Sequence, residues 1–292
     1  MPASIADPID IPALVKEAYC KGTGDMLSDY SYVLTSVERS RDKKGKTKEE
    51  STTYEVFVPI LKSGTRGDGV LVVTSRNGVP VPASELEKAR LAAGKRLEKA
   101  EEISANEKSS PPESAPDVQG MLPVGMYTQT TSNRLSFSKE DSATLGIHTF
   151  LQTCELTLAR REQLEGRETL VFNFTPRAGA QFAPNEKYIA RLSGEIWIDA
   201  QDRIVVRLVG RPALSTRNAG AATPSGEAPP AVYVEMMRLP EGNWLPRIAR
   251  INGADYQKLF DGINTESIST FSNFVRFSIE IKDVKINSDG KP

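Results

Sequence analysis

Short runs in which hydrophobic and polar residues alternate are the feature that most limits how this chain can fold. A period of two is typical of strands that bury one face, whereas a helix repeats every 3.6 residues. Such runs occur at both ends of the chain and begin, for example, near Tyr30, Tyr54 and Cys154. Short turn segments separate most of them, and Asn77-Gly78 is a strong hairpin signal. The sequence therefore predicts roughly nine or ten strands, linked mainly by hairpins, in an antiparallel meander.

Two segments show the helical period instead. Residues 10–22 begin with Asp10 as a cap and end at Gly22, which predicts a short amphipathic helix. Ser84 and Glu87 form a capping box at the start of a longer, highly charged helix that runs to Lys108. We expect this longer helix to be a loosely docked lid over the open side of the sheet, because its hydrophobic stripe is thin. The lid residues are Leu86, Ala89, Ala93 and Leu97.

The scarcity of histidine and cysteine limits the chemistry that the chain can perform. His148 is the one histidine among 292 residues, and a Ser-His-Asp triad or a histidine acid-base group would depend on it. Cys20 and Cys154 allow at most one disulfide and, with one histidine, cannot form a four-ligand zinc site. We therefore expect no catalytic residues, no metal and no cofactor, whereas the pairing of the two cysteines stays open.

Charge and hydropathy narrow the choice of partners. Lys+Arg 37 against Asp+Glu 38 gives a net charge of −1, which creates no field that would attract nucleic acid. No stretch approaches the roughly 18 apolar residues of a transmembrane helix. The first residues also lack the basic and apolar regions of a signal peptide. From these features the chain is either cytosolic or a mature exported segment with a start Met attached.

One hairpin adds a resemblance to this reading. Residues 192–199, LSGEIWID, and residues 202–208, DRIVVRL, resemble the hairpin "G-x-hydrophobic-W-I-D, turn, hydrophobic-V-R" of the bacterial lipoprotein-carrier superfamily with its LolA/LolB-like fold. Residues 172–176 and 30–32 look like the flanking strands. The resemblance implies an α+β fold, with a strongly curved antiparallel sheet, an incomplete β-barrel, whose open side is covered by helices. It also implies export to the periplasm and a hydrophobic cavity for lipid or acyl chains.

We therefore predict a single LolA/LolB-like domain over residues 1–292, with a charged helix and Pro-rich insertion at 82–120 and a flexible loop at 210–231. The predicted function is that of a periplasmic, non-enzymatic binding protein for a lipid, acyl chain or other apolar ligand. A lipoprotein or another envelope protein is a further candidate partner. The alternative is an envelope protein-protein interaction module with a filled core, because periodicity does not distinguish a filled core from a cavity. The predicted cavity-facing residues are Leu170, Phe172, Phe174, Ile196, Ile198, Val206 and Leu208.

Overall fold

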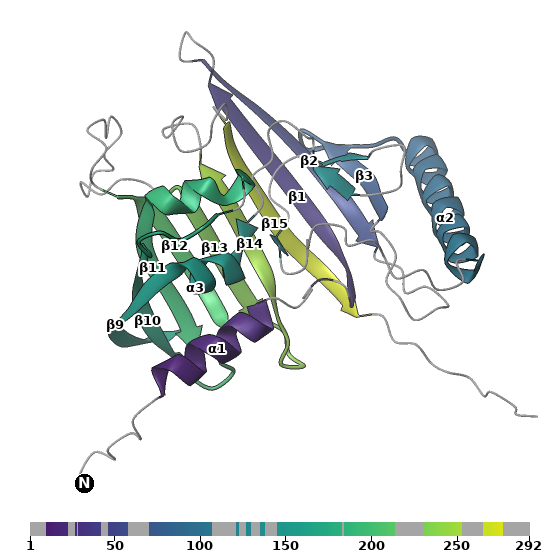
Figure 1. Ribbon diagram of the computed structural model, residues 1–292. Coiled ribbons are helices and arrows are strands. Elements are labelled where there is room, and N and C mark those ends of the chain that lie inside the picture. The colour runs from purple at the N-terminus through teal and green to yellow at the C-terminus, as the bar shows by residue number, and fades with distance from the viewer. Residues whose placement is uncertain are drawn as a thin grey trace, which may run out of the picture.

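A computed structural model of the chain, shown in Figure 1, describes most of its predicted strands and helices. The described residues are 10–22, 27, 29–41, 46–57, 70–106, 121–122, 127–129, 135–137, 145–182, 184–213, 230–252 and 265–276. Much of the predicted insertion (107–120), most of the predicted loop (214–229) and the end of the predicted last strand (277–281) lie outside them. The single-domain organisation stays a prediction.

Eleven strands form one antiparallel sheet in the order β4-β3-β2-β1-β15-β14-β13-β12-β11-β10-β9. They are β1 (Tyr30–Arg41), β2 (Thr47–Phe57), β3 (Val70–Arg76), β4 (Val79–Pro80), β9 (Cys154–Leu164), β10 (Arg167–Pro176), β11 (Leu192–Asp199), β12 (Val205–Pro212), β13 (Val232–Arg238), β14 (Trp244–Asn252) and β15 (Thr265–Arg276). Two small sheets pair β5 (Met121–Leu122) with β8 (Leu145–Gly146) and β6 (Tyr127–Gln129) with β7 (Leu135–Phe137). The large sheet is curved and is not closed on itself, because β4 and β9 are its two edges (Figure 1). The predicted α+β class and open antiparallel sheet are thereby confirmed.

The strand order departs from a simple meander at one place. β1 lies between β2 and β15, so the first strand pairs with the last described strand, from Tyr30 opposite Arg276 to Ser40 opposite Thr265. Alternation of hydrophobic residues from Val275 to Ile281 predicts a last strand that begins near Val275, but β15 already begins at Thr265. Residues 265–274 are mostly polar, so backbone pairing with β1 and β14 makes this segment a strand without a hydrophobic pattern.

The hairpin between β1 and β2 also differs from the prediction. The composition of residues 41–51, nearly all charged or small, predicts a solvated hairpin tip, yet Lys48 pairs with Ser40 and Glu50 with Glu38 in the ladder. The strands therefore continue through most of the charged run. Charged side chains are compatible with a strand where both of its faces reach solvent, and they carry no hydrophobic alternation that a sequence pattern could detect.

The inner face of the sheet bears the main core. Here α1 (Ile11–Gly22), α3 (Ile147–Thr153) and the 3-10 helix η1 (Pro184–Arg191) pack against inward-facing strand residues. Figure 1 shows α1 and α3 on the concave side of β9–β14. The largest fully buried side chains of the main core are Phe150, Phe172, Phe174, Leu14, Leu34, Leu145, Ile147, Leu170, Ile189, Leu192, Ile196 and Ile198. The three short helices, rather than the long charged one, therefore cover the inner face.

The long helix α2 (Ala83–Asn106) packs on the opposite, outer face. It places Ala93 against Val70 and Val72 of β3. Val70 lies opposite Phe57 and Val72 opposite Glu55, whereas Val56, between them on β2, belongs to the main core. The predicted position of α2 over the open side is therefore wrong. Its thin stripe indicated that one helix face is buried, but not which face of the sheet would bury it.

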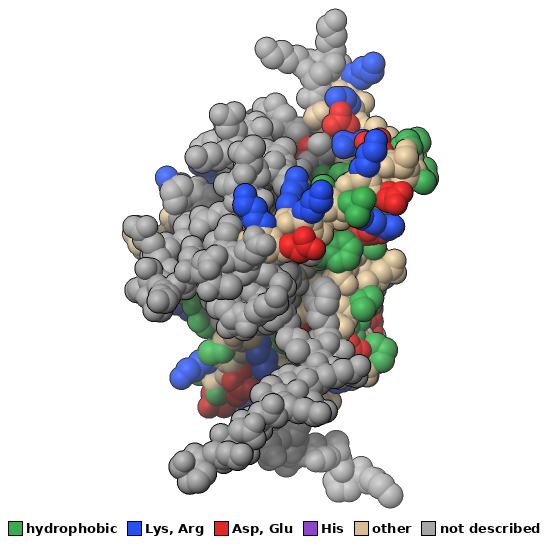
Figure 2. Space-filling view, turned by 90° about the vertical axis from the view of Figure 1, so that its right-hand side faces the viewer, with side chains coloured by type: hydrophobic (Ala, Val, Ile, Leu, Met, Phe, Trp, Pro, Cys, Tyr) green, Lys and Arg blue, Asp and Glu red, His purple; other side chains and the backbone are tan. Residues whose placement is uncertain are grey.

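Three of the predicted lid residues are accounted for by this outer contact. Ala93 is buried, Leu86 and Ala89 are partly buried against β3, and the side chain of Leu97 lies outside the described residues. Figure 2 faces the side of the molecule that bears α2, where basic and acidic side chains are interspersed with hydrophobic ones. One of the exposed hydrophobic residues of α2 is Leu91, with 61% of its surface accessible.

Candidate ligand-binding core

The hairpin of β11 and β12 organises the centre of the inner face. Gly194 lies directly opposite Gly210, and a Cβ atom on Gly194 would stand 1.9 Å from the Val209 carbonyl oxygen and 3.0 Å from the Phe174 ring. The absence of a side chain therefore lets Phe174 lie close to the backbone of the hairpin. Phe150 of α3 packs edge-on against Phe174, with 5.4 Å between ring centroids. The glycine of the hairpin motif thus sets the position at which α3 docks.

Six of the seven predicted cavity-facing residues share the main core. Each is at most 1% exposed; they are Leu170, Phe172, Phe174, Ile196, Ile198 and Leu208. The six side chains face the same side of β10, β11 and β12, as their alternation predicts. Their role in holding a ligand stays a prediction.

Val206 is the exception, and its assignment to the inner face is wrong. The register between β11 and β12 shifts so that Ile198 lies opposite Val205, while Trp197 lies opposite Arg207. This bulge leaves Val206 without a partner on β11 and turns it to the outer face. There it belongs to a second hydrophobic cluster with Val171 and Trp197. A bulge changes the parity of a strand, which strict alternation in the sequence cannot reveal.

Trp197, the aromatic residue of the hairpin motif, lies on this outer face. The guanidinium carbons of Arg160 and Arg207 each lie 5.7 Å from its ring centroid, and its indole N–H donates to Glu162. Arg160 also pairs with Glu162 and Glu195. Arginine stems and cation-π contacts thus cover a hydrophobic cluster with paired charges. We assign this arrangement to stabilisation of the sheet.

The acidic turn after β11 is held by hydrogen bonds. The fully buried Asp199 accepts from Arg167 Nε at 2.6 Å and from Nη2 at 2.8 Å. Its Oδ1 also accepts from the backbone N–H groups of Gln201 at 3.0 Å and Asp202 at 2.6 Å. These bonds are those of an Asx-type turn. The position of the two aspartates at the end of β11 and just after it in the sequence predicts that they are turn residues, and these bonds confirm it.

Asp202 extends the same network across the sheet. Burial alone would raise the pKa of its carboxyl group, but a hydrogen bond from Trp244 Nε1, one from Arg238 and the charge of Arg167 together lower that pKa. The Trp244 bond is 2.8 Å long and the Arg238 bond 2.9 Å. The turn thereby ties β10, β13 and β14 together at one end of the strands.

The histidine and the cysteines lie at the junction of α1 with α3. The His148 ring meets the Tyr19 ring edge-on, with centroids 6.2 Å apart. The two cysteines form no disulfide, since Cys20 is exposed on α1 and Cys154 is buried at the start of β9. Burial raises the pKa of the Cys154 thiol to about 11. Among the described residues, no group of three histidine, cysteine or acidic side chains could hold a metal ion.

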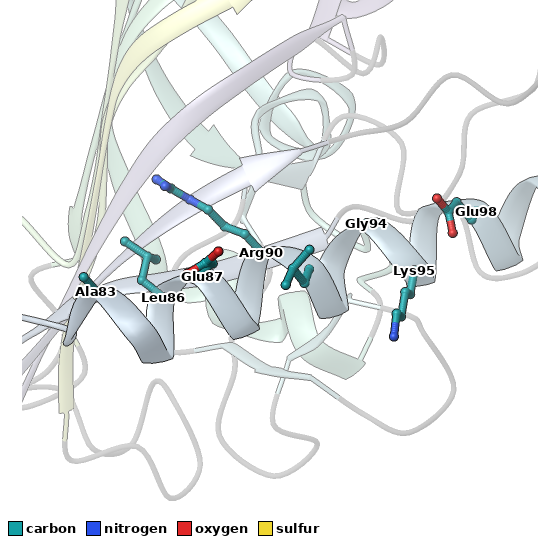
Figure 3. A pocket seen from close by; sticks show the side chains of 8 residues that line it. Ala83, Leu86, Glu87, Arg90, Gly94, Lys95 and Glu98 are labelled. Atoms are coloured by element: carbon teal, nitrogen blue, oxygen red, sulfur yellow. The ribbon is translucent and has the colours of Figure 1, made fainter.

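Three surface hollows are lined by described residues, and none of the three contains a predicted cavity residue. A hollow of about 540 Å³ follows one side of α2. Beside it, the Arg90 side chain extends toward β2, whereas Lys95 points away (Figure 3). Arg90 donates two hydrogen bonds to Glu55 of β2, of 3.1 Å from Nε and 2.6 Å from Nη2. A second hollow of about 290 Å³ lies between Arg90 and the neighbouring parts of β1 and β2. The third, of about 570 Å³, lies between α1, α3 and the start of β9.

Among known proteins, this chain is similar to several whose structures have been solved. No protein-family model and no curated protein matches the sequence. A domain from Vibrio parahaemolyticus assigned to outer membrane lipoprotein sorting is 10% identical, with 90% of this chain and 91% of that chain covered and a TM-score of 0.34. A DUF1329 family protein from Desulfovibrio piger is 13% identical, with coverages of 92% and 95% and a TM-score of 0.35.

A LolA superfamily protein from Nitrosomonas europaea is 10% identical, with coverages of 94% and 96% and a TM-score of 0.26. In the part of the chain that the structure describes, no helix is both long and apolar enough to cross a membrane.

Proposed function

We propose that this chain is a non-enzymatic binding protein of the bacterial periplasm for a lipid, an acyl chain or another apolar ligand, similar to a lipoprotein carrier. The observation that carries this proposal is the continuous hydrophobic inner face of an unclosed sheet. Main-core residues extend from Val56 on β2 to Phe174 on β10. The hairpin resemblance supports the same class of ligand and the same compartment.

Access to this face depends on the helices that cover it. α1 buries Leu14, Ala18 and Gly22, and its partly exposed Ile11, Val15 and Tyr19 also pack against the main core. Its contacts are mainly with α3 rather than with strands. Because its closest contacts are with another helix and not with the sheet, α1 is the element that a ligand would displace most easily. We therefore assign the role of the movable cover to α1 instead of α2.

Native mass spectrometry of protein purified without detergent tests the proposal. We expect a population whose excess mass corresponds to a lipid or fatty acid that is released on denaturation. A second sample, stripped of lipid and incubated with a long-chain acyl compound, should regain a single bound molecule. Protein that is ligand-free in both samples would contradict an apolar binding function.

The second candidate function is an envelope protein-protein interaction module, and the edges of the sheet favour it. β9 is an edge strand of 11 residues without proline, whereas the other edge, β4, has two residues and contains Pro80. A long edge strand without proline offers backbone groups to a partner strand. Thr157→Pro, at an exposed position of β9, should abolish such pairing and leave lipid binding unchanged.

A further inference from the structure

The hollow between α1, α3 and the start of β9, here the α1–α3 hollow, lies at the border of the inner face and has the size of a ligand site. Its volume of about 570 Å³ falls within the roughly 300–1,000 Å³ that is typical of small-molecule pockets. Its lining residues are Ile11, Pro12, Val15, Lys16, Tyr19, Leu151, Gln152, Leu156 and Arg177. Three separate elements and the residue that follows β10 therefore contribute to it.

The floor of the α1–α3 hollow is hydrophobic. Leu151 is buried, and Val15, Tyr19 and Leu156 are partly exposed side chains that rest on the main core. Covering these side chains with an alkyl chain would remove hydrophobic surface from water, which is favourable by about 25 cal/mol per Å². The floor thus suits a chain of methylene groups.

The rim of the α1–α3 hollow is basic. Lys16 and Arg177 are both exposed, and neither has a carboxylate partner within ion-pair distance among the described residues. The neighbouring Glu17 is already bound to Arg203. Elsewhere on the sheet, arginines such as Arg167 are paired with acidic side chains. No acidic residue lines the described part of this hollow, so its charge is complementary to an anion.

We infer that the α1–α3 hollow binds a single alkyl chain that ends in an anionic head group, a carboxylate or a phosphate. The chain lies over the floor formed by Val15, Tyr19 and Leu156. The head group lies at the rim and accepts charge-assisted hydrogen bonds from Lys16 and Arg177. None of the predicted cavity-facing residues lines this site, so the inference does not require that the centre of the inner face hold a ligand.

Titration calorimetry with three twelve-carbon probes below their micellar concentrations tests the charge requirement. The probes are dodecanoate, dodecyl phosphate and dodecyltrimethylammonium. We expect the two anions to bind at least tenfold more tightly than the cation, and the stronger of the two anions identifies the head group. Equal affinity of the cationic probe would overturn the inference.

Variants locate the binding in this hollow. Lys16→Glu combined with Arg177→Glu should weaken anion binding at least tenfold, whereas Arg76→Glu combined with Lys88→Glu, two exposed positions on the other side of the molecule, should not. Gln152→Trp fills the hollow from an exposed position and should block all three probes, whereas Gln152→Ala should not. Unchanged binding in the Lys16/Arg177 variant would refute the site. A co-purified ligand that persists in that variant would assign the ligand to the inner face instead.

Discussion

The helices on the two faces of the sheet differ in a way that their lengths do not suggest. α3 has seven residues and buries five of them, whereas α2 has 24 residues and, among its described side chains, Ala93 is the buried one. α3 presents Phe150 to Phe174 in the main core, and α2 presents alanines to the valines of β3. Burial follows from the size of the side chains at the contact and not from helix length, because stabilisation scales with hydrophobic surface removed from water.

The largest expected effect comes from truncating the aromatic contact of α3. Phe150→Ala should lower the free energy of unfolding by about 3–5 kcal/mol, because a fully buried ring is replaced by a cavity. Leu86→Ala on α2 removes a partly buried side chain and should lower the free energy of unfolding by about 1 kcal/mol. Urea titrations of both variants provide the measurement. Equal losses would show that the two helices are docked with similar strength.

Hydrogen exchange should separate α2 from the main core without any substitution. Amides from Leu86 to Ala93 are expected to exchange at least about 100-fold faster than those from Leu170 to Phe174, because α2 can detach without opening the core. Protection of α2 equal to that of β10 would make this helix an integral part of the fold.

A smaller effect is expected from the ion pairs of the two regions. Asp199→Asn leaves Arg167 with a weaker partner at a buried site and should lower the free energy of unfolding by about 2 kcal/mol. The loss is no larger because Arg167 still pairs with Asp202. Arg90→Gln removes the exposed pair between α2 and Glu55 and should leave the unfolding midpoint nearly unchanged. Thermal denaturation of the two variants, with wild-type protein as reference, makes the comparison. A larger drop of the unfolding midpoint in Arg90→Gln than in Asp199→Asn would show that the exposed ion pair contributes more stability than the buried one.

The smallest effect concerns pH. The pKa of Asp202 is lower in the folded protein than the usual value of about 3.9, so its charged form stabilises the fold above that pH. This contribution is lost as the pH falls below about 4 through the folded-state pKa. Stability measured between pH 6 and pH 3 should therefore decline less steeply in Asp202→Asn than in the wild type. Glu168→Gln, which removes a half-exposed carboxylate, is the control. Parallel curves for Asp202→Asn and wild type would contradict the assignment.

The sequence by itself determined the fold class and most of the inner face. Alternation at Leu170, Phe172 and Phe174 was sufficient because a period of two places these three side chains on the same face of the strand, although Val171 is buried on the other face. The turn acids Asp199 and Asp202 could also be recognised, since their hydrogen bonds are local.

Tertiary structure alone decided the remaining features. The pairing of β1 with β15 depends on contacts between residues far apart in the chain, whereas the bulge at Val206 and the packing of α2 on the outer face depend on how neighbouring elements pair and pack. The hollow that joins Lys16 to Arg177 also depends on contacts between residues far apart in the chain. A hydrophobic period states that a face is buried, but the partner that buries it is selected by the packing of the whole sheet.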